Sequence, residues 1–236
     1  VTGVQTCALP ISARAAARES PADAATQALA GAVFAQAGQF AEAKTYLQRM
    51  ATLTGDGAAS QVSLGRVELL EGNIAAARQR FEGALQKEPG HVGASIALAQ
   101  VLVGTDESVR AIHLLTAARK AHPDSIQAGV LETELLVATG DAKAAVQLAS
   151  ELVNEAPENA AIHAAQGRAL AAAGQQEESV RVLAAAVRRW PRSAGIRYEL
   201  ARTLAANGQN PAAVDAARAV LDIYMEIGRA SCRERV

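Results

Sequence analysis

The side chains that could carry out catalysis in this chain are scattered and form no catalytic motif. None of the four histidines has another metal-ligand type four residues away, as a helical metal site requires; they are His91, His113, His122 and His163. The sequence contains no glycine-rich phosphate loop, no nucleophile elbow and no paired-carboxylate motif. We therefore expect no enzyme activity, no cofactor and no metal site.

Polar side chains that could recognise a partner recur at intervals of 34 residues. One such series is Arg66, Gln100, Glu134, Arg168 and Arg202. An arginine guanidinium can hold a carboxylate or a backbone carbonyl of an extended peptide. The competing interpretation is that these residues are solvated on a helix surface and pair locally with Glu68 or Glu199.

The single tryptophan is a second candidate for recognition. Trp190 precedes Pro191 at a predicted helix end, and we expect its ring to pack on Ile196. Exposure as a partner anchor is the alternative, because tryptophan is enriched in binding hot spots.

These residues must be positioned by a helical hairpin, which is clearest over residues 58–91. Apolar residues recur at helical spacing before and after Gly72, which suits the left-handed conformation that ends a helix. Gly65 allows close approach of a second helix, and Phe81 is expected to fill the gap between them. Pro89 ends the second helix. One hairpin cannot bury its own apolar faces, so it must stack on copies of itself.

Three residue types repeat this hairpin with a 34-residue period. Prolines occur at 21, 89, 123, 157 and 191, and glycines at 38, 72, 140, 174 and 208, with Asp106 completing the second series. Alanines occur at 43, 77, 111, 145 and 213. This period resembles the tetratricopeptide repeat family, in which each repeat is a pair of helices. The resemblance implies an all-α fold, a right-handed α-solenoid of about six helix-turn-helix repeats.

The resemblance covers residues 13–225. Residues 13–23 are interpreted as the end of a truncated repeat, and the six repeats are 24–57, 58–91, 92–125, 126–159, 160–193 and 194–225. The tryptophan typical of the family is absent at the fourth position, where this chain has Gln27, Gln61, Ser95, Gly129, His163 and Arg197. The Lys and Asn constellation of chaperone-binding relatives is also absent.

The family's geometry implies that the fifth and ninth positions of each repeat line a concave groove. The candidate partner-binding residues are therefore Val62, Arg66, Ile96, Gln100, Val130, Glu134, Arg168, Tyr198 and Arg202. Ala28, Ala32 and Ala164 complete the two series. They predict a shallow apolar strip beside a line of polar side chains.

Both ends of the chain depart from the repeat pattern. Residues 1–12 and 226–236 resemble the translated read-through of a sequencing adapter and show no helical period, so we interpret both as non-native scars. Natural tails are the alternative. Both cysteines, Cys7 and Cys232, fall in these peptides. We expect residues 13–225 to be a fragment of a longer array whose native N-terminus is missing.

Composition excludes several kinds of partner. Half of the residues are hydrophobic and only 3% are aromatic, which suits helices packed through small residues. A formal net charge of −1 predicts no nucleic-acid surface. No apolar run approaches the roughly 18 residues of a membrane-spanning helix.

Three functions fit this sequence. The first, which we favour, is a protein-interaction scaffold that binds a protein or peptide segment in the groove. The second is the substrate-recruiting arm of an enzyme, such as a glycosyltransferase, whose catalytic domain lies beyond the ends. The third is an envelope assembly factor, because endings such as KEPGH and AHPDS resemble bacterial PEP-CTERM and exopolysaccharide-system repeat lipoproteins. The compartment stays open between the cell envelope and the cytoplasm.

Overall fold

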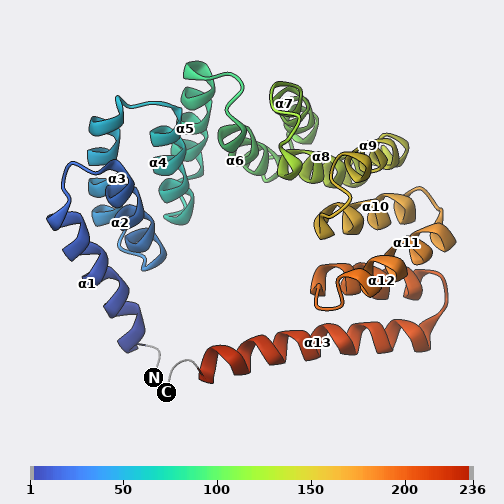
Figure 1. Cartoon of the computed structure of the whole chain (residues 1–236). Helices are drawn as coiled ribbons and strands as arrows, with labels where there is room; N and C mark the ends of the chain where they lie inside the picture. Colours follow the sequence, from blue (N-terminus) through green and yellow to red (C-terminus); the bar gives the residue numbers. More distant parts are fainter. Residues whose placement is uncertain (1–2, 234–236) are drawn as a thin grey trace. The chain divides into compact units, whose positions relative to one another are not determined.

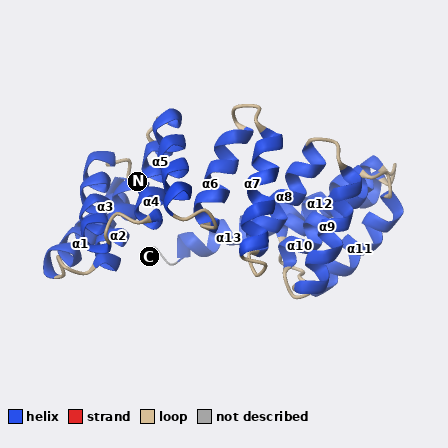
Figure 2. Cartoon of the chain, turned by 90° about the horizontal axis from the view of Figure 1, so that it is seen from above, coloured by secondary structure: helices blue, strands red, loops and turns tan. Residues whose placement is uncertain are grey.

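The computed structural model describes the backbone of residues 3–233 and the side chains of residues 10–226. In that part of the chain every regular element is a helix, which confirms the predicted all-α repeat fold (Figure 2). The helices are α1 (Gly3–Glu19), α2 (Ala24–Gln36), α3 (Phe40–Thr54), α4 (Ala58–Leu70), α5 (Ile74–Lys87), α6 (Val92–Val103), α7 (Ser108–Ala121), α8 (Ile126–Ala138), α9 (Ala142–Glu155), α10 (Ala160–Ala172), α11 (Gln176–Arg189), α12 (Ala194–Ala206) and α13 (Asn210–Arg233) (Figure 1).

The chain forms two compact units, Val1–His122 and Pro123–Val236. We call these unit 1 and unit 2. Each is a stack of hairpins made from a first helix and a second helix. The first helices are α2, α4 and α6 in unit 1, and α8, α10 and α12 in unit 2.

Two kinds of contact build the stack inside each unit. Second helices pack on the first helix of the next repeat, as α3 does on α4 and α11 on α12. First helices also pack on each other, α2 on α4 and α4 on α6 in unit 1, and α8 on α10 and α10 on α12 in unit 2. Helix α1 packs on α2, which is the contact expected of the second helix of a preceding repeat.

The turn inside each hairpin requires one residue with positive φ. Gly72 adopts a φ of 88°, and the next amide, Asn73 N–H, donates to the Glu68 carbonyl at 2.8 Å, which closes the end of α4. Asp106 stands at the equivalent place after α6 and adopts a φ of 59°. Aspartate is one of the few non-glycine residues that tolerate this region, so the hairpin keeps its geometry without glycine.

The core of a hairpin depends on a missing side chain. A Cβ atom added at Gly65 would lie 2.5 Å from Cε1 of Phe81, far closer than two carbon atoms can approach. Phe81 is fully buried, as are Ala77 and Ala84 on the same side of α5. The expected roles of Gly65 and Phe81 are confirmed.

In three repeats the side chain at the fourth position contacts a main-chain carbonyl in or beside the loop that precedes the first helix. The Gln27 amide donates to the carbonyls of Ala17 and Ser20 at 3.1 and 3.2 Å. Nε of Arg197 donates to the carbonyl of Pro191 at 2.9 Å. His163 Nε2 lies 2.9 Å from the carbonyl oxygen of Pro157. These polar contacts replace the large aromatic side chain that the family has at this position.

The ends of the described chain are helical, which corrects one expectation. Helix α1 begins at Gly3 and contains Pro10, and α13 continues to Arg233, although residues 1–12 and 226–236 show no helical period. An established helix needs only one more residue fixed for each added hydrogen bond, so it propagates more easily than it starts. Residues 1, 2 and 234–236 lie outside the described residues, and the adapter origin of both peptides stays a prediction.

Ion pairs link the second helices α5 and α7 in unit 1. Arg78 on α5 holds Glu107 with two hydrogen bonds, of which Nη2 to Oε2 is 3.1 Å long. Arg110 on α7 in turn reaches Glu82 on α5 at 3.1 Å. Hydrogen bonds from Arg78, and further ones from Thr105 and Arg110, outweigh the effect of burial and lower the pKa of Glu107 to about 2.

Replacing Phe81 by alanine should lower the free energy of unfolding by about 3–5 kcal/mol, because it empties the centre of one hairpin. The loss of stability should be confined to the substituted repeat and those next to it, because each repeat contacts only its neighbours. Phe81 belongs to unit 1 and Trp190 to unit 2. In a urea titration, Phe81→Ala should therefore shift the unfolding transition followed by circular dichroism more than the transition followed by tryptophan fluorescence. Leu183→Ala, at a buried site in unit 2, is the matched control and should move the fluorescence transition. Complete loss of helicity in Phe81→Ala without urea would contradict a stack of repeats.

The low pKa of Glu107 predicts acid sensitivity in unit 1. A lowered carboxyl pKa stabilises the folded state above the ordinary value of about 4.3, and this contribution disappears as the pH falls towards 2. Glu107→Gln should lower the urea midpoint at pH 7 and make that midpoint less dependent on pH between 4.5 and 2. The control is Glu88→Gln, at an exposed residue of the same unit. If the urea midpoint depended equally on pH in wild type and Glu107→Gln, the ion pair between Glu107 and Arg78 would contribute nothing to the stability of the folded state.

Candidate partner-binding face

The nine candidate residues all lie on first helices, but the structure exposes them unequally. The ninth positions Arg66 and Gln100 in unit 1, and Arg202 in unit 2, are exposed. Glu134 and Arg168 in unit 2 are half-buried. The predicted polar line therefore reaches the surface in each unit, on the helices α4, α6, α8, α10 and α12.

The fifth positions do not form the expected exposed apolar strip. Val62 and Ile96 are buried, because neighbouring first helices pack side by side and cover them. Val130 is partly buried against a cluster that contains Leu152. Tyr198 is the exception, with 58% of its surface exposed on α12.

Unit 2 brings four of the polar residues on the first helices into one ion-pair network. Nη1 of Arg168 donates to Oε1 of Glu134 at 2.7 Å. Nε and Nη2 of Arg168 donate to Oε1 of Glu199 at 3.0 and 2.7 Å. Nη2 of Arg202 lies 2.9 Å from Oε2 of Glu199. The network therefore links α8, α10 and α12, and it contains two positive and two negative charges.

Glu199 is the buried centre of this network, with only 2% of its surface exposed. Burial of Arg168 acts to lower its pKa, but the hydrogen bonds and charges of Glu199 and Glu134 outweigh burial, so that the pKa is raised. Arg168 is thus held as a cation whose donors point at two carboxylates. A buried charge costs free energy unless it is paired and hydrogen-bonded, which explains why the two arginines converge on Glu199.

Local pairing accounts for part of the polar series. Arg168 and Arg202 pair with Glu199, as the competing interpretation predicts. Arg66 does not pair with Glu68, which accepts instead from Lys44 at 3.1 Å and from Asn73 at 3.2 Å. Arg168 is therefore a residue that positions others, whereas Arg66 and Arg202 present their side chains to solvent.

A shallow hollow of about 250 Å³ lies beside the network in unit 2. The hollow is walled by small and apolar residues from α8, α10 and α12, with the two arginines and an amide at its edge: Val137, Arg168, Ala171, Ala172, Gln176, Arg202, Thr203 and Ala206. Sequence reasoning missed this feature. The available signal was the recurrence of small residues at the ends of first helices, such as Ala172 and Ala206 at the same repeat position.

The first helices of unit 2 offer guanidinium donors, an aromatic hydroxyl and a small apolar hollow. Two of the histidines have structural contacts elsewhere: His91 accepts from the Ala94 amide at the start of α6, and His163 contacts Trp190 and the Pro157 carbonyl. Within the described residues no group of three or more His, Cys, Asp or Glu side chains could hold a metal ion. The described helices also include none that is long and apolar enough to cross a membrane.

Trp190 packs as expected against the cluster of Leu183, Ala186 and Ile196. The guanidinium of Arg189 lies 5.1 Å from the centre of its ring. This prediction from the sequence is confirmed.

Comparison with known proteins gives a consistent result. Two family models described as tetratricopeptide repeat match residues 68–131 and 109–169, and residues 29–92 and 164–226. None of the curated proteins matches the chain significantly.

Several solved structures are similar in fold. A tetratricopeptide repeat protein from Parabacteroides merdae is 14% identical, with a TM-score of 0.69 over 90% of this chain and 80% of that one. A thermophilic protein of this class from Thermus thermophilus is 16% identical, with a TM-score of 0.60 over 77% of this chain and 99% of that one. MamA from Desulfovibrio magneticus is 16% identical, with a TM-score of 0.58 over 72% of this chain and 96% of that one.

The buried centre of the network can be tested directly. Glu199→Ala should destabilise unit 2 by about 3 kcal/mol, because the buried Glu199 carboxylate accepts two hydrogen bonds from the half-buried Arg168 and pairs with Arg202. Glu134→Ala removes the more exposed carboxylate of the same arginine and should cost about 0–1 kcal/mol. The measurement is the urea midpoint followed by Trp190 fluorescence. Similar small shifts in both variants would mean that Glu199 is not the centre of the network.

Proposed function

The chain belongs to the tetratricopeptide repeat family, and we propose that it is a non-catalytic scaffold that binds a segment of a partner protein on its first helices. Proteins of this family are commonly protein-interaction scaffolds. The partner-binding role, and the residues that carry it, are our proposal for this chain.

The observation that carries this proposal is the pair of exposed side chains on α12. Tyr198 and Arg202 are four residues apart and therefore lie on the same side of the helix. Both are more than half exposed, although their neighbours Glu199, Ala201, Thr203 and Leu204 are buried. Tyrosine and arginine are enriched among the residues that dominate binding energy.

Arg202 forms an ion pair with Glu199 in the network beneath it. Its contact with Glu199 involves only Nη2, so the remaining N–H groups of the guanidinium can reach a ligand. Glu199 is itself fixed by Arg168. An arginine held in this way loses less conformational freedom on binding than a free one, which favours affinity.

The adjacent hollow suggests what kind of segment binds. A small apolar side chain could enter between Ala171, Ala172 and Ala206, while Arg202 donates to a backbone carbonyl of the same segment. An extended peptide offers both groups along one edge. The balanced charge of the network argues against a strongly charged ligand.

Alanine substitution of Tyr198 or Arg202 should weaken binding about tenfold or more, equivalent to about 1.4 kcal/mol, without changing helicity. The probe is a peptide selected against the full chain from a random display library, and affinity is measured by fluorescence anisotropy. Arg66→Ala tests in the same way whether the exposed polar residues on the first helices of unit 1 contribute to peptide binding.

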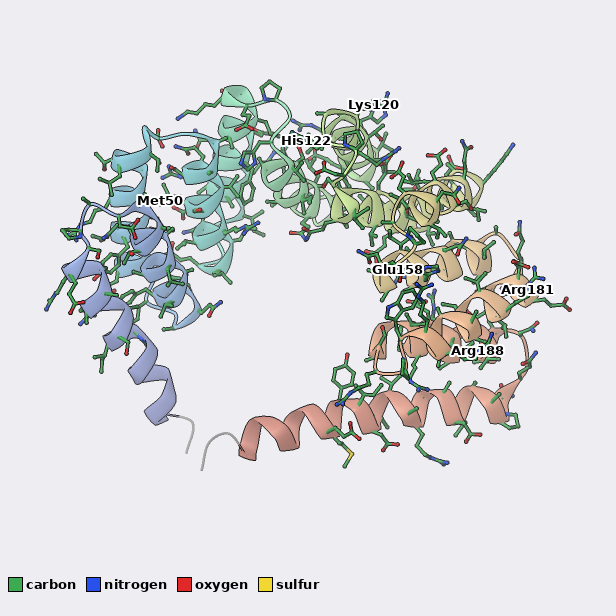
Figure 3. All side chains as sticks on the ribbon, in the orientation of Figure 1. Met50, Lys120, His122, Glu158, Arg181 and Arg188 are labelled. Carbon is green, nitrogen blue, oxygen red and sulfur yellow. The ribbon has the colours of Figure 1, made fainter. Side chains whose placement is uncertain are left out.

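The matched control is Arg181→Ala, which removes an exposed arginine from the second helix α11 (Figure 3). This variant should bind normally. Unchanged binding by Arg202→Ala and Tyr198→Ala together, or an equal loss in Arg181→Ala, would place the ligand elsewhere.

A further inference from the structure

One second helix of unit 1 carries an arginine where the other repeats have an apolar or aromatic residue. Arg80 lies on α5, and the residues at the same position of the other five repeats are Tyr46, Leu114, Leu148, Val182 and Ala216. Leu148 is buried at this position and Leu114 is half-buried. Arg80 is half-buried as well. A residue that breaks a pattern followed elsewhere in the same fold is a candidate for a functional role.

The guanidinium of Arg80 forms no ion pair with any of the described residues. Its one hydrogen bond among them runs from Nη1 to Oε1 of Gln61, at 3.2 Å. Arg78 on the same helix, by contrast, donates to both carboxylate oxygens of Glu107. Most of the N–H donors of Arg80 are therefore without a partner in the part of the chain that the structure describes.

The carboxylates around Arg80 are held by lysines instead. Asp56 accepts from Nζ of Lys87 at 2.9 Å, and Glu68 accepts from Nζ of Lys44 at 3.1 Å. Hydrogen bonds from Lys87 and from Gln61 lower the pKa of Asp56, and the charge of Arg80 makes a smaller contribution. Neither carboxylate competes for the free donors of Arg80 by direct contact.

Arg80 lines a hollow of about 460 Å³ between α3 and α5. Its walls include Gln48, Ala51, Thr52, Gln61, Leu64 and Arg80, and the loop after α3 completes them. We call this space the α3–α5 hollow. A second hollow, of about 580 Å³, adjoins it, because Gln61 and Arg80 line both. A ligand therefore has room on either side of the guanidinium.

The equivalent hollow one repeat later serves as an internal comparison. It lies between α5 and α7, and Leu98 lines it where Leu64 lines the α3–α5 hollow. Leu114 stands in the place of Arg80. The arginine that does line this second space, Arg110, already pairs with two carboxylates. The repeat architecture therefore forms such a hollow without an unpaired arginine in its wall.

We propose that the α3–α5 hollow binds a carboxylate of a ligand, which pairs with the guanidinium of Arg80. The two groups match in shape, since a guanidinium can donate two parallel hydrogen bonds to a carboxylate. A singly charged carboxylate suits this place better than a doubly charged phosphate, because Asp56 and Glu68 also line the two hollows and repel further negative charge. The carboxylate can belong to an acidic side chain of a peptide or to a small free acid.

This site does not rest on the function proposed for unit 2. It lies on the second helices of unit 1, and its recognition element is a carboxylate rather than a peptide backbone. Either site could fail its test without affecting the other.

Two tripeptides of equal size test the proposal by ¹H–¹⁵N NMR of the full chain at fixed ionic strength. Acetyl-Ala-Glu-Ala-amide should shift the Nε–Hε signal of Arg80 and the backbone amide signals of Gly55 and Gln61 in a saturable manner. Acetyl-Ala-Gln-Ala-amide lacks the negative charge and should bind at least tenfold more weakly. Sodium acetate separates the two sources of the carboxylate: binding as tight as that of the glutamate tripeptide indicates a small free acid, and weaker binding indicates a peptide side chain.

Variants of the chain locate the site. Arg80→Leu should abolish the saturable shifts of the Gly55 and Gln61 amides and leave circular dichroism unchanged, because leucine occupies this position in two other repeats. The matched control is Arg49→Leu, which removes an exposed arginine of α3 that does not line the hollow. This variant should bind the glutamate tripeptide normally.

Four results would overturn the proposal. Absence of saturable shifts, or equal binding of the two tripeptides, would show that the hollow does not recognise a carboxylate. Binding that survives Arg80→Leu would place the carboxylate elsewhere. Tighter binding of inorganic phosphate than of acetate and the glutamate tripeptide would assign the hollow to a different anion. A loss of helicity in Arg80→Leu would mean that the arginine stabilises the fold.

Discussion

The close approach of the two helices in a hairpin is the constraint on which the rest of the structure depends. In unit 1 the ring of Phe81 occupies the space that a side chain at Gly65 would need, and in unit 2 Leu183 does the same above Gly167. This proximity contributes to the spacing at which the hairpins stack. That spacing in turn brings Arg168 and Glu199, which are 31 residues apart in the sequence, within hydrogen-bond distance.

The polar network and the small residues around it serve different purposes in unit 2. Pairing with two arginines offsets the cost of burying Glu199, while the alanines beside it leave room on the surface. The result is a face with fixed cations next to a shallow hollow. Of the two exposed residues on α12, Arg202 is paired within this network, and a paired side chain loses less freedom when a ligand binds.

The 34-residue period allowed the fold to be predicted from the sequence, because glycine, alanine and proline each have one structural role in the hairpin. The positive φ of Asp106 also followed from its place in the glycine series. The site was harder to predict. Burial of Val62 and Ile96 depends on how closely first helices lie together, and burial of Glu199 depends on arginines from another turn and another repeat. Neither property is encoded in a single helix.

The contacts between fourth-position side chains and main-chain carbonyls allow different residue types at this position. Gln27, His163 and Arg197 all reach a main-chain carbonyl, a target that every residue type presents equally. A glutamine can therefore be exchanged for a histidine or an arginine without a compensating change in the loop. Three different residue types can therefore meet the same structural requirement at this position. This tolerance is consistent with a shared repeat fold at the 14–16% identity found among the similar structures.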